Sequence, residues 1–158
     1  MRWALLVLAL SACASLERSS IDHPEFDLTG RIAARYRDES FSGNLAWRHA
    51  TGGDEMLIST ALGQGVARIV RNGDAVTLTT AEPREYHAAD AESLTEEVLG
   101  FRVPLTGLAQ WVQGLPAPEL ESRGWKVEYQ DYDAQRRPKR LRLTYPGVEL
   151  RLAISEWK

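Results

Sequence analysis

The chain has 158 residues, of which 44% are hydrophobic and 26% are charged, and its formal net charge is -3 at pH 7. This composition is typical of a globular protein, excludes a disordered one, and fits a single compact domain. The weak acidity argues against nucleic-acid binding, which needs a basic face, and also against anchoring by charge to anionic lipid.

The first residues have the pattern of an export signal. Arg2 precedes an apolar run over residues 3–10, which is too short to span a bilayer of about 20 apolar residues. Leu10-Ser11-Ala12-Cys13 resembles a lipobox, the cleavage motif of bacterial lipoproteins. That resemblance implies that residues 1–12 form a signal peptide and that Cys13 receives a diacylglyceryl thioether and an acylated amino terminus. The alternative, a buried cysteine in an ordinary helix, is disfavoured by the signal pattern directly before it.

Cys13 is the only cysteine in the chain, so it forms no internal disulfide, and lipid attachment accounts for an unpaired thiol in an exported protein. Two or more acyl chains anchor a protein stably. Asp after the cysteine retains lipoproteins at the inner membrane in Gram-negative envelopes, and here that residue is Ala14. We therefore expect a lipid anchor on the periplasmic face of the outer membrane. Residues 13–25 are then the lipidated cysteine and its tether, and residues 26–158 form one domain.

Alternation of apolar and polar residues predicts strands in the first half of the domain. The residues on one face of the first strand are Phe26, Leu28, Ile32, Ala34 and Tyr36, and those of the second are Phe41, Gly43, Leu45 and Trp47. Shorter candidates cover residues 55–60, 66–71 and 75–80. Glycines mark the turns between them, and Asn72-Gly73 is a strong signal for a two-residue hairpin.

Helical spacing interrupts the strands after Asp90. The apolar residues with this spacing are Ala91, Leu94 and Val98, followed by Gly100 as a stop signal, and then Leu105, Leu108 and Val112, between Pro104 and Gly114. Pro116 and Pro118 prevent continuation of the second helix. Strands resume at residues 125–132, 140–145 and 148–157. An antiparallel sheet whose two helices lay their apolar faces on it is an α+β fold, a curved sheet with a helical cover.

Catalytic and metal-binding patterns are missing from the sequence. His23, His49 and His87 are too widely spaced for a metal-ligand pattern, and Gly63-Gln64-Gly65 lacks the lysine of a phosphate loop. The carboxylates of residues 90–97 are typical of a helix N-terminus and its solvated face. We predict no catalytic residue, no metal and no cofactor, and hence no enzyme.

The aromatic residues suggest a different kind of site. They are Trp47, Trp111, Trp125, Trp157, Tyr129, Tyr132 and Tyr145. Each one taken singly fits ordinary core packing. Together, on a sheet covered by only two short helices, they are candidates to line an apolar cavity.

Ordered segments along the domain resemble the LolB family. They are residues 26–31, Ser42-Gly43 with Trp47, Leu62-Gly63, Asp90-Ala91-Glu92 with Leu94, the run Gly100, Pro104, Leu108, Trp111, Gly114 and Pro116, then residues 124–129 with Tyr132, and Leu150-Arg151-Leu152 with Ile154 and Trp157. The resemblance implies an incomplete, unclosed antiparallel β-barrel with a short helical lid over a hydrophobic cavity. It also implies a monomeric receptor that accepts lipoprotein cargo from a LolA-like periplasmic carrier and inserts it into outer-membrane lipid.

The predicted site has two parts. Alternation and the helical stripes select eight residues as the lining of the acyl-chain cavity: Ile32, Leu45, Trp47, Leu94, Leu108, Trp111, Leu143 and Leu152. Leu62 lies between two short strands, and the residues alone leave it equally open to burial in the core. The resemblance places it on a projecting loop that enters the membrane.

Two departures from the family pattern concern size. The tether before Phe26 is short, so a helix usually present before the first strand is expected to be missing. Residues 118–124 are too few for a hairpin found in many relatives, which predicts a barrel one or two strands smaller and leaves the cavity volume open. The alternative function is a structural or assembly lipoprotein that binds a partner protein through its sheet. It fits the lipobox and the alternation equally well, but not the helical motif with its tryptophans; a third reading, an anchored hydrolase, lacks candidate residues.

Overall fold

A computed structural model describes residues 21–82, 84–99 and 101–158 of this chain, without the side chains of residues 98 and 99. The described residues do not include the predicted signal peptide, Cys13 or most of the tether. The prediction that a helix is missing before the first strand falls on the same undescribed residues. Gly100, the predicted stop of the first helix, also lies outside them.

Nine strands of the described residues form one antiparallel sheet. They are β1 (Phe26–Tyr36), β2 (Glu39–Ala50), β3 (Gly53–Ser59), β4 (Gly65–Asn72), β5 (Ala75–Thr80), β6 (Glu85–Ala88), β7 (Lys126–Tyr132), β8 (Pro138–Tyr145) and β9 (Val148–Trp157). Their order in the sheet is β6-β5-β4-β3-β2-β1-β9-β8-β7, so β6 and β7 are the two edges and the sheet is unclosed. The prediction of an incomplete antiparallel barrel is confirmed.

The last strand of the chain pairs with the first. Ile32 of β1 lies opposite Gly43 of β2 on one side and opposite Leu152 of β9 on the other. The Asn72-Gly73 hairpin is confirmed between β4 and β5, where Gly73 has a φ of 60° that an L side chain rarely adopts. Sequence reasoning missed β6, because its four residues are too short to display an alternating pattern.

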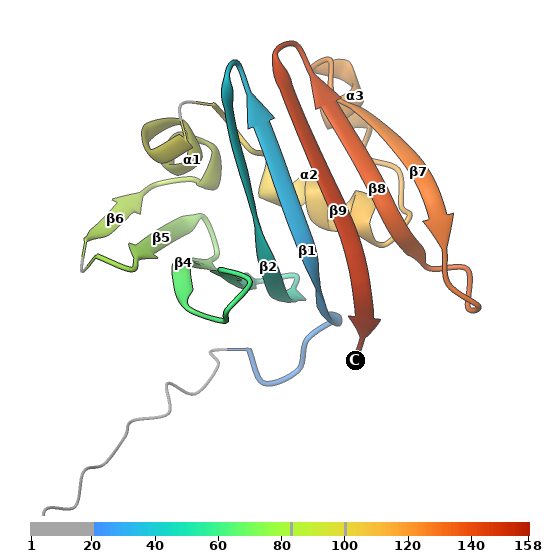
Figure 1. The fold of residues 1–158 in the computed structure, drawn as a ribbon, viewed down its shortest axis with the longest axis horizontal. Helices are drawn as coiled ribbons and strands as arrows, with labels where there is room; N and C mark the ends of the chain where they lie inside the picture. The colour runs from blue at the N-terminus through green and yellow to red at the C-terminus, as the bar shows by residue number, and fades with distance from the viewer. Residues whose placement is uncertain (1–20, 83, 100) are drawn as a thin grey trace, which may run out of the picture.

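Three short helices cover one face of the sheet (Figure 1): α1 (Ala91–Leu99), α2 (Leu105–Val112) and α3 (Pro118–Ser122). The first two were predicted. The carboxylate of Asp90 accepts a hydrogen bond of 2.7 Å from the Ser93 backbone N–H at the start of α1. The sequence pattern predicts only a stop signal at Pro118, but proline is also favourable in the first turn of a helix, and there it starts α3.

The hydrophobic core lies between the inner face of the sheet and these helices. A Cβ at Gly107 of α2 would lie 2.3 Å from a side-chain carbon of Leu120, so only glycine lets α2 and α3 approach this closely. Near the C-terminal end of α2, the hydroxyl of Tyr129 in β7 donates a hydrogen bond of 3.0 Å to the backbone carbonyl of Trp111. Close packing thus joins α2 to α3, and a polar contact joins α2 to the edge of the sheet.

Candidate functional site

The structure gathers all eight predicted lining residues in one apolar cluster. Seven of them are buried: Leu45, Trp47, Leu94, Leu108, Trp111, Leu143 and Leu152. The eighth, Ile32, is half-buried and packs against the others. They come from β1, β2, β8 and β9 of the sheet and from α1 and α2, so both walls of the expected cavity contribute.

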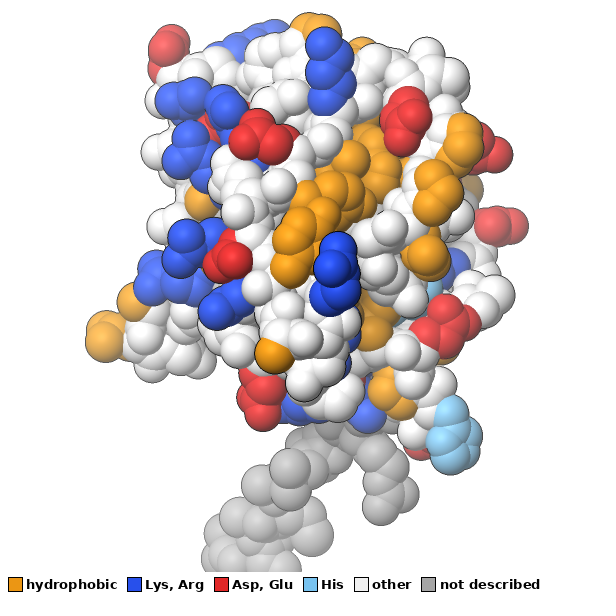
Figure 2. All heavy atoms as spheres, turned by 90° about the vertical axis from the view of Figure 1, so that its right-hand side faces the viewer, with side chains coloured by type: hydrophobic (Ala, Val, Ile, Leu, Met, Phe, Trp, Pro, Cys, Tyr) orange, Lys and Arg blue, Asp and Glu red, His pale blue; other side chains and the backbone are white. Residues whose placement is uncertain are grey.

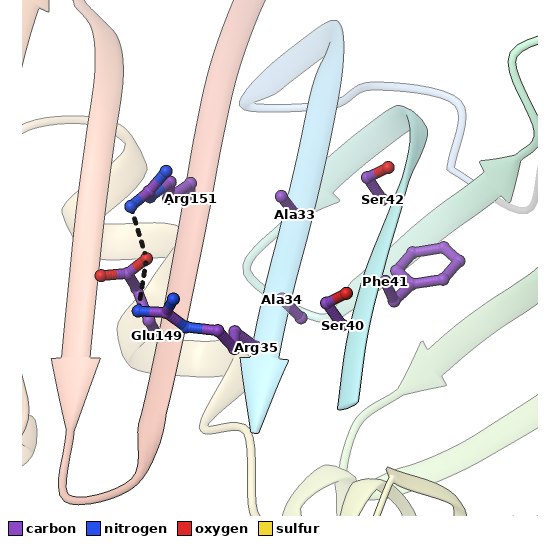
Figure 3. Close-up of a pocket in the computed structure, with 8 residues that line it drawn as sticks. All are labelled: Ala33, Ala34, Arg35, Ser40, Phe41, Ser42, Glu149 and Arg151. Carbon is purple, nitrogen blue, oxygen red and sulfur yellow. Dashed lines mark ion pairs between the residues drawn. The ribbon is translucent and has the colours of Figure 1, made fainter. Parts of the chain in front are cut away.

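Their own side chains fill the space between these walls. Trp47 is 0% exposed and Trp111 is 1% exposed. One hollow of about 260 Å³ lies instead over β1, β2 and β9 (Figure 3), and another of about 190 Å³ lies over β3, β4 and β5. Neither hollow is lined by any of the eight residues. Their role in holding an acyl chain stays a prediction.

One polar atom inside the apolar cluster lacks a partner. The indole Nε1 of Trp111 is buried and, within the part of the chain that the structure describes, finds no acceptor. A buried N–H group normally has a hydrogen-bond partner. This group could therefore serve a ligand that brings its own acceptor.

A bidentate ion pair links two parts of the helical cover, α1 and the end of α3. Arg123, just after α3, donates to both carboxylate oxygens of Glu92 in α1, at 2.7 and 2.5 Å. The hydrogen bond from Arg123 holds the pKa of Glu92 below its usual range and raises the pKa of the guanidinium. Both side chains are partly exposed, at 44% and 24%, so water screens the attraction between their charges.

The edge strand β7 exposes apolar side chains beside the helices. Tyr132 is 51% exposed and its ring lies 5.9 Å from that of Tyr129, while Leu115, after α2, is 49% exposed. Figure 2 shows hydrophobic side chains reaching the surface on this side of the molecule. Apolar surface is therefore accessible near the unpaired edge of the sheet.

Leu62 projects into solvent. It is 91% exposed, in a turn where the Gly63 N–H donates to the Thr60 carbonyl at 2.9 Å and the Thr60 N–H donates to the Gln64 carbonyl at 2.9 Å. Gly63 has a φ of 83° and no neighbour within 4 Å of where a Cβ would be. Burial in the core, one of the two readings from the residues alone, is wrong. The role of Leu62 in entering a membrane stays a prediction.

A buried polar network at the start of β1 was not foreseen. The Asp54 carboxylate, 0% exposed, accepts hydrogen bonds from Trp47 Nε1 at 2.8 Å and from Arg71 Nε at 2.6 Å. It also lies 2.6 Å from Nδ1 of His49, whose Nε2 is 3.8 Å from Glu25 in the tether. Burial by itself raises the pKa of this carboxyl, but the hydrogen bonds from its three partners outweigh burial. The pKa of Asp54 therefore lies below its ordinary value of 3.8.

This network is structural in its geometry. It ties the end of the tether to β2, β3 and β4, and it gives both ring nitrogens of His49 a carboxylate neighbour. The described residues hold no cluster of three or more His, Cys, Asp or Glu side chains arranged to bind a metal ion. None of the helices within these residues is long and apolar enough to span a bilayer.

The sequence of this chain is similar to those of a known protein family. Residues 24–157 match the family model described as outer membrane lipoprotein LolB. The chain is 35% identical over 176 aligned positions to the outer-membrane lipoprotein LolB of Thiobacillus denitrificans, covering 98% of this chain and 95% of that protein. It is also 35% identical to the protein of the same name from Nitrosomonas europaea, covering 90% and 76% of the two chains.

Among solved structures, a LolA superfamily protein from Nitrosomonas europaea matches with a TM-score of 0.49 and 10% identity, over 86% of this chain and 87% of that one. The family match extends over nearly the whole folded domain, and the alignments cover 95% and 76% of the two LolB relatives. This chain belongs to the LolB family of outer-membrane lipoproteins.

Proposed function

We propose that this protein is a receptor anchored to the outer membrane through acyl chains on Cys13. It accepts lipoproteins from a soluble, LolA-like periplasmic carrier, shelters their acyl chains beneath the helical cover, and inserts them into the outer membrane. The observation that carries the proposal is the single apolar cluster between an unclosed sheet and three short helices. Membership of the LolB family supports the same role.

The physical task requires an apolar shelter. Burying one methylene group is worth about 0.8 kcal/mol, so an acyl chain of roughly fourteen methylenes costs on the order of 11 kcal/mol in water. Cargo can then pass from the carrier to the receptor and on to the bilayer if each binds it more tightly than the one before. Each tenfold difference in affinity is worth about 1.4 kcal/mol. The receptor has to bind the cargo more tightly than the carrier does and less tightly than the bilayer does.

The closely packed cluster becomes a cavity when the cover moves. Separation of α1 and α2 from the sheet exposes Leu94 and Trp111 on one wall and Ile32 on the other. The partly exposed ion pair between Glu92 and Arg123 is a weak fastening that permits this movement. The acyl chains replace side-chain contacts that are lost on opening, so the open form is populated when cargo is bound.

Trp111 gives the cavity one polar contact. Its unpartnered indole N–H can donate a hydrogen bond to an ester or amide carbonyl at the head of an acyl chain. Leu62 acts at the next step. Its exposed side chain, on a glycine-containing turn, enters the bilayer and opens a path for the departing chains.

A photoreactive amino acid at two adjacent positions tests the cavity. Ile32 lies on the inner face of β1 and Ala33 on the outer face, because neighbouring residues of a strand point to opposite sides. We expect benzoylphenylalanine to crosslink to acyl chains of a bound lipoprotein at position 32 and not at position 33. Equal crosslinking at both positions, or none at position 32 while lipoprotein transfer proceeds, would show that the cavity is elsewhere. Binding of a protein partner without any acyl crosslink would favour the assembly function instead.

A further inference from the structure

The outer face of the sheet, turned away from the helices, carries an unusual concentration of cations. Three cross-strand rows run from β1 through β9 and β8 to β7. In order, they are Arg31, Ala153, Arg140 and Asp131; Ala33, Arg151, Arg142 and Glu128; and Arg35, Glu149, Thr144 and Lys126. Six cations and three carboxylates give these rows a net charge of +3, whereas the whole chain has -3. We call these three rows the basic face.

Figure 2 shows lysine and arginine side chains gathered along its left-hand side, which is the face of the sheet turned to the viewer in Figure 1. The charge is thus segregated to one side of the molecule. The net acidity of the chain, which argued against electrostatic attraction to anionic lipid, does not describe this face. The carboxylates that outnumber the cations overall lie elsewhere.

The strand register that forms the basic face would by itself destabilise the sheet. Arg151 lies directly opposite Arg142, and like charges in this position destabilise a strand pair. Glu149 compensates them, with oxygens 2.5 Å from Arg142 and 2.7 Å from Arg151. Figure 3 shows the ion pair between Glu149 and Arg151. The hydrogen bond from Arg142 keeps the pKa of Glu149 below its usual range, so the carboxylate stays ionised.

Compensation of the basic face is only partial. Glu149 also has Arg35 at 3.8 Å, so this carboxylate serves three guanidinium groups, and Glu128 adds one further contact of 3.9 Å, to Arg142. Arg31 and Arg140, which flank Ala153, form no ion pair with any residue that the structure describes. Several guanidinium N–H donors therefore remain available to an external anion.

Phospholipid phosphates match these donors. A guanidinium group presents paired N–H groups that fit two phosphate oxygens, and five of the six cations are arginines. As an outer-membrane lipoprotein, the chain is held beside a lipid surface, and residues 13–25 extend at most about 45 Å. That reach lets a face of the domain turn toward the membrane. We propose that the basic face docks on anionic phospholipid headgroups and orients the domain on the membrane.

This contact goes beyond the proposed function, because it depends neither on the acyl-chain cavity nor on insertion of Leu62. An exposed label tests it in the lipid-anchored protein, purified from membranes and reconstituted into vesicles. Acylated Cys13 leaves a cysteine introduced at Ser42, on the outer face of β2, as the unique thiol for a fluorophore. A nitroxide on lipid headgroups quenches the fluorophore when this face lies on the membrane. A second label at Ser122, on α3, reports the opposite orientation.

We expect stronger quenching at position 42 on phosphatidylcholine vesicles containing about one-third phosphatidylglycerol than on phosphatidylcholine alone. The difference should shrink in about 1 M salt, which shortens the screening length to about 3 Å. Arg31→Ser with Arg140→Ser removes two cations and should lower the docking equilibrium constant roughly 30-fold. Arg84→Ser with Arg102→Ser, two exposed arginines outside the basic face, makes the same change in total charge and should leave quenching unaltered.

Quenching at position 42 that is independent of phosphatidylglycerol, or equal in the two double variants, would overturn the proposal. If Arg31→Ser with Arg140→Ser slows acceptance of cargo from the carrier but leaves quenching unchanged, the basic face binds an acidic protein instead. That result would also overturn the proposal. Acyl crosslinking at position 32 in the same variants separates this result from failure of the proposed receptor function, because the cavity lies on the other side of the sheet.

Discussion

Replacement of Asp54 by Asn isolates the energetic role of the buried network. The substitution keeps the size of the side chain but removes the charge that faces Arg71, which is itself only 8% exposed. Leaving one member of a buried ion pair without its partner typically costs 3–5 kcal/mol, roughly, in the free energy of unfolding. The Nε of Arg71, now 2.6 Å from a carboxylate oxygen, would face a neutral amide.

Thermal and urea unfolding of the purified protein measure the effect. For a domain of this size, roughly 2–4 °C of melting temperature correspond to each kcal/mol, so we expect Asp54→Asn to melt about 6–20 °C lower. Asp74→Asn, at an exposed position in the neighbouring turn, is the matched control and should change stability by less than about 0.5 kcal/mol.

Removal of both charges tests the explanation itself. Asp54→Asn combined with Arg71→Leu leaves no unpaired buried charge, so the double variant should regain part of the stability lost in Asp54→Asn. A loss below about 1 kcal/mol in Asp54→Asn would refute the reasoning. So would a double variant whose loss equals the sum of the two single losses, because the two charges would then not be coupled.

The same network predicts a pH dependence of stability. Because folding lowers the pKa of Asp54, its contribution to the free energy of unfolding is complete above pH 3.8 and is lost as the pH falls further. Acid unfolding of the wild-type and Asp54→Asn proteins measures this difference. Leu62→Glu should leave folding and cargo acceptance intact but slow release into vesicles roughly 10- to 100-fold, since burial of a leucine is worth about 1.5–3 kcal/mol; release at the wild-type rate would exclude the loop from insertion. Arg123→Gln opens the pair with Glu92 and should speed uptake of a photoreactive fatty acid while costing less than about 1 kcal/mol of stability. Unchanged uptake would mean that another contact holds the cover. Cys13→Ala should abolish lipidation and leave the protein in the soluble fraction; intact-mass analysis showing an unmodified Cys13 in the mature wild-type chain would contradict the anchor.

Local patterns in the sequence determined the elements of this protein. Alternation along residues 26–36 predicted β1, because a strand with one buried face needs an apolar residue at every second position. Asn72-Gly73 predicted its hairpin, because a tight turn requires residues that tolerate positive φ. The apolar stripe of α2 selected Leu108 and Trp111 for the core by the same periodic reasoning, and both are buried.

Tertiary structure alone decided which distant residues meet. The pairing of β9 with β1 joins the two ends of the domain, and no local pattern encodes a partner more than a hundred residues away. Asp54 and Arg71 become a buried pair, and Arg31, Arg140 and Arg151 become neighbours, only through strand register. A charged residue in a sequence looks like a solvated one until the fold places its neighbours. Periodicity reports which face a side chain is on, whereas interaction energies depend on distances that the whole sheet sets.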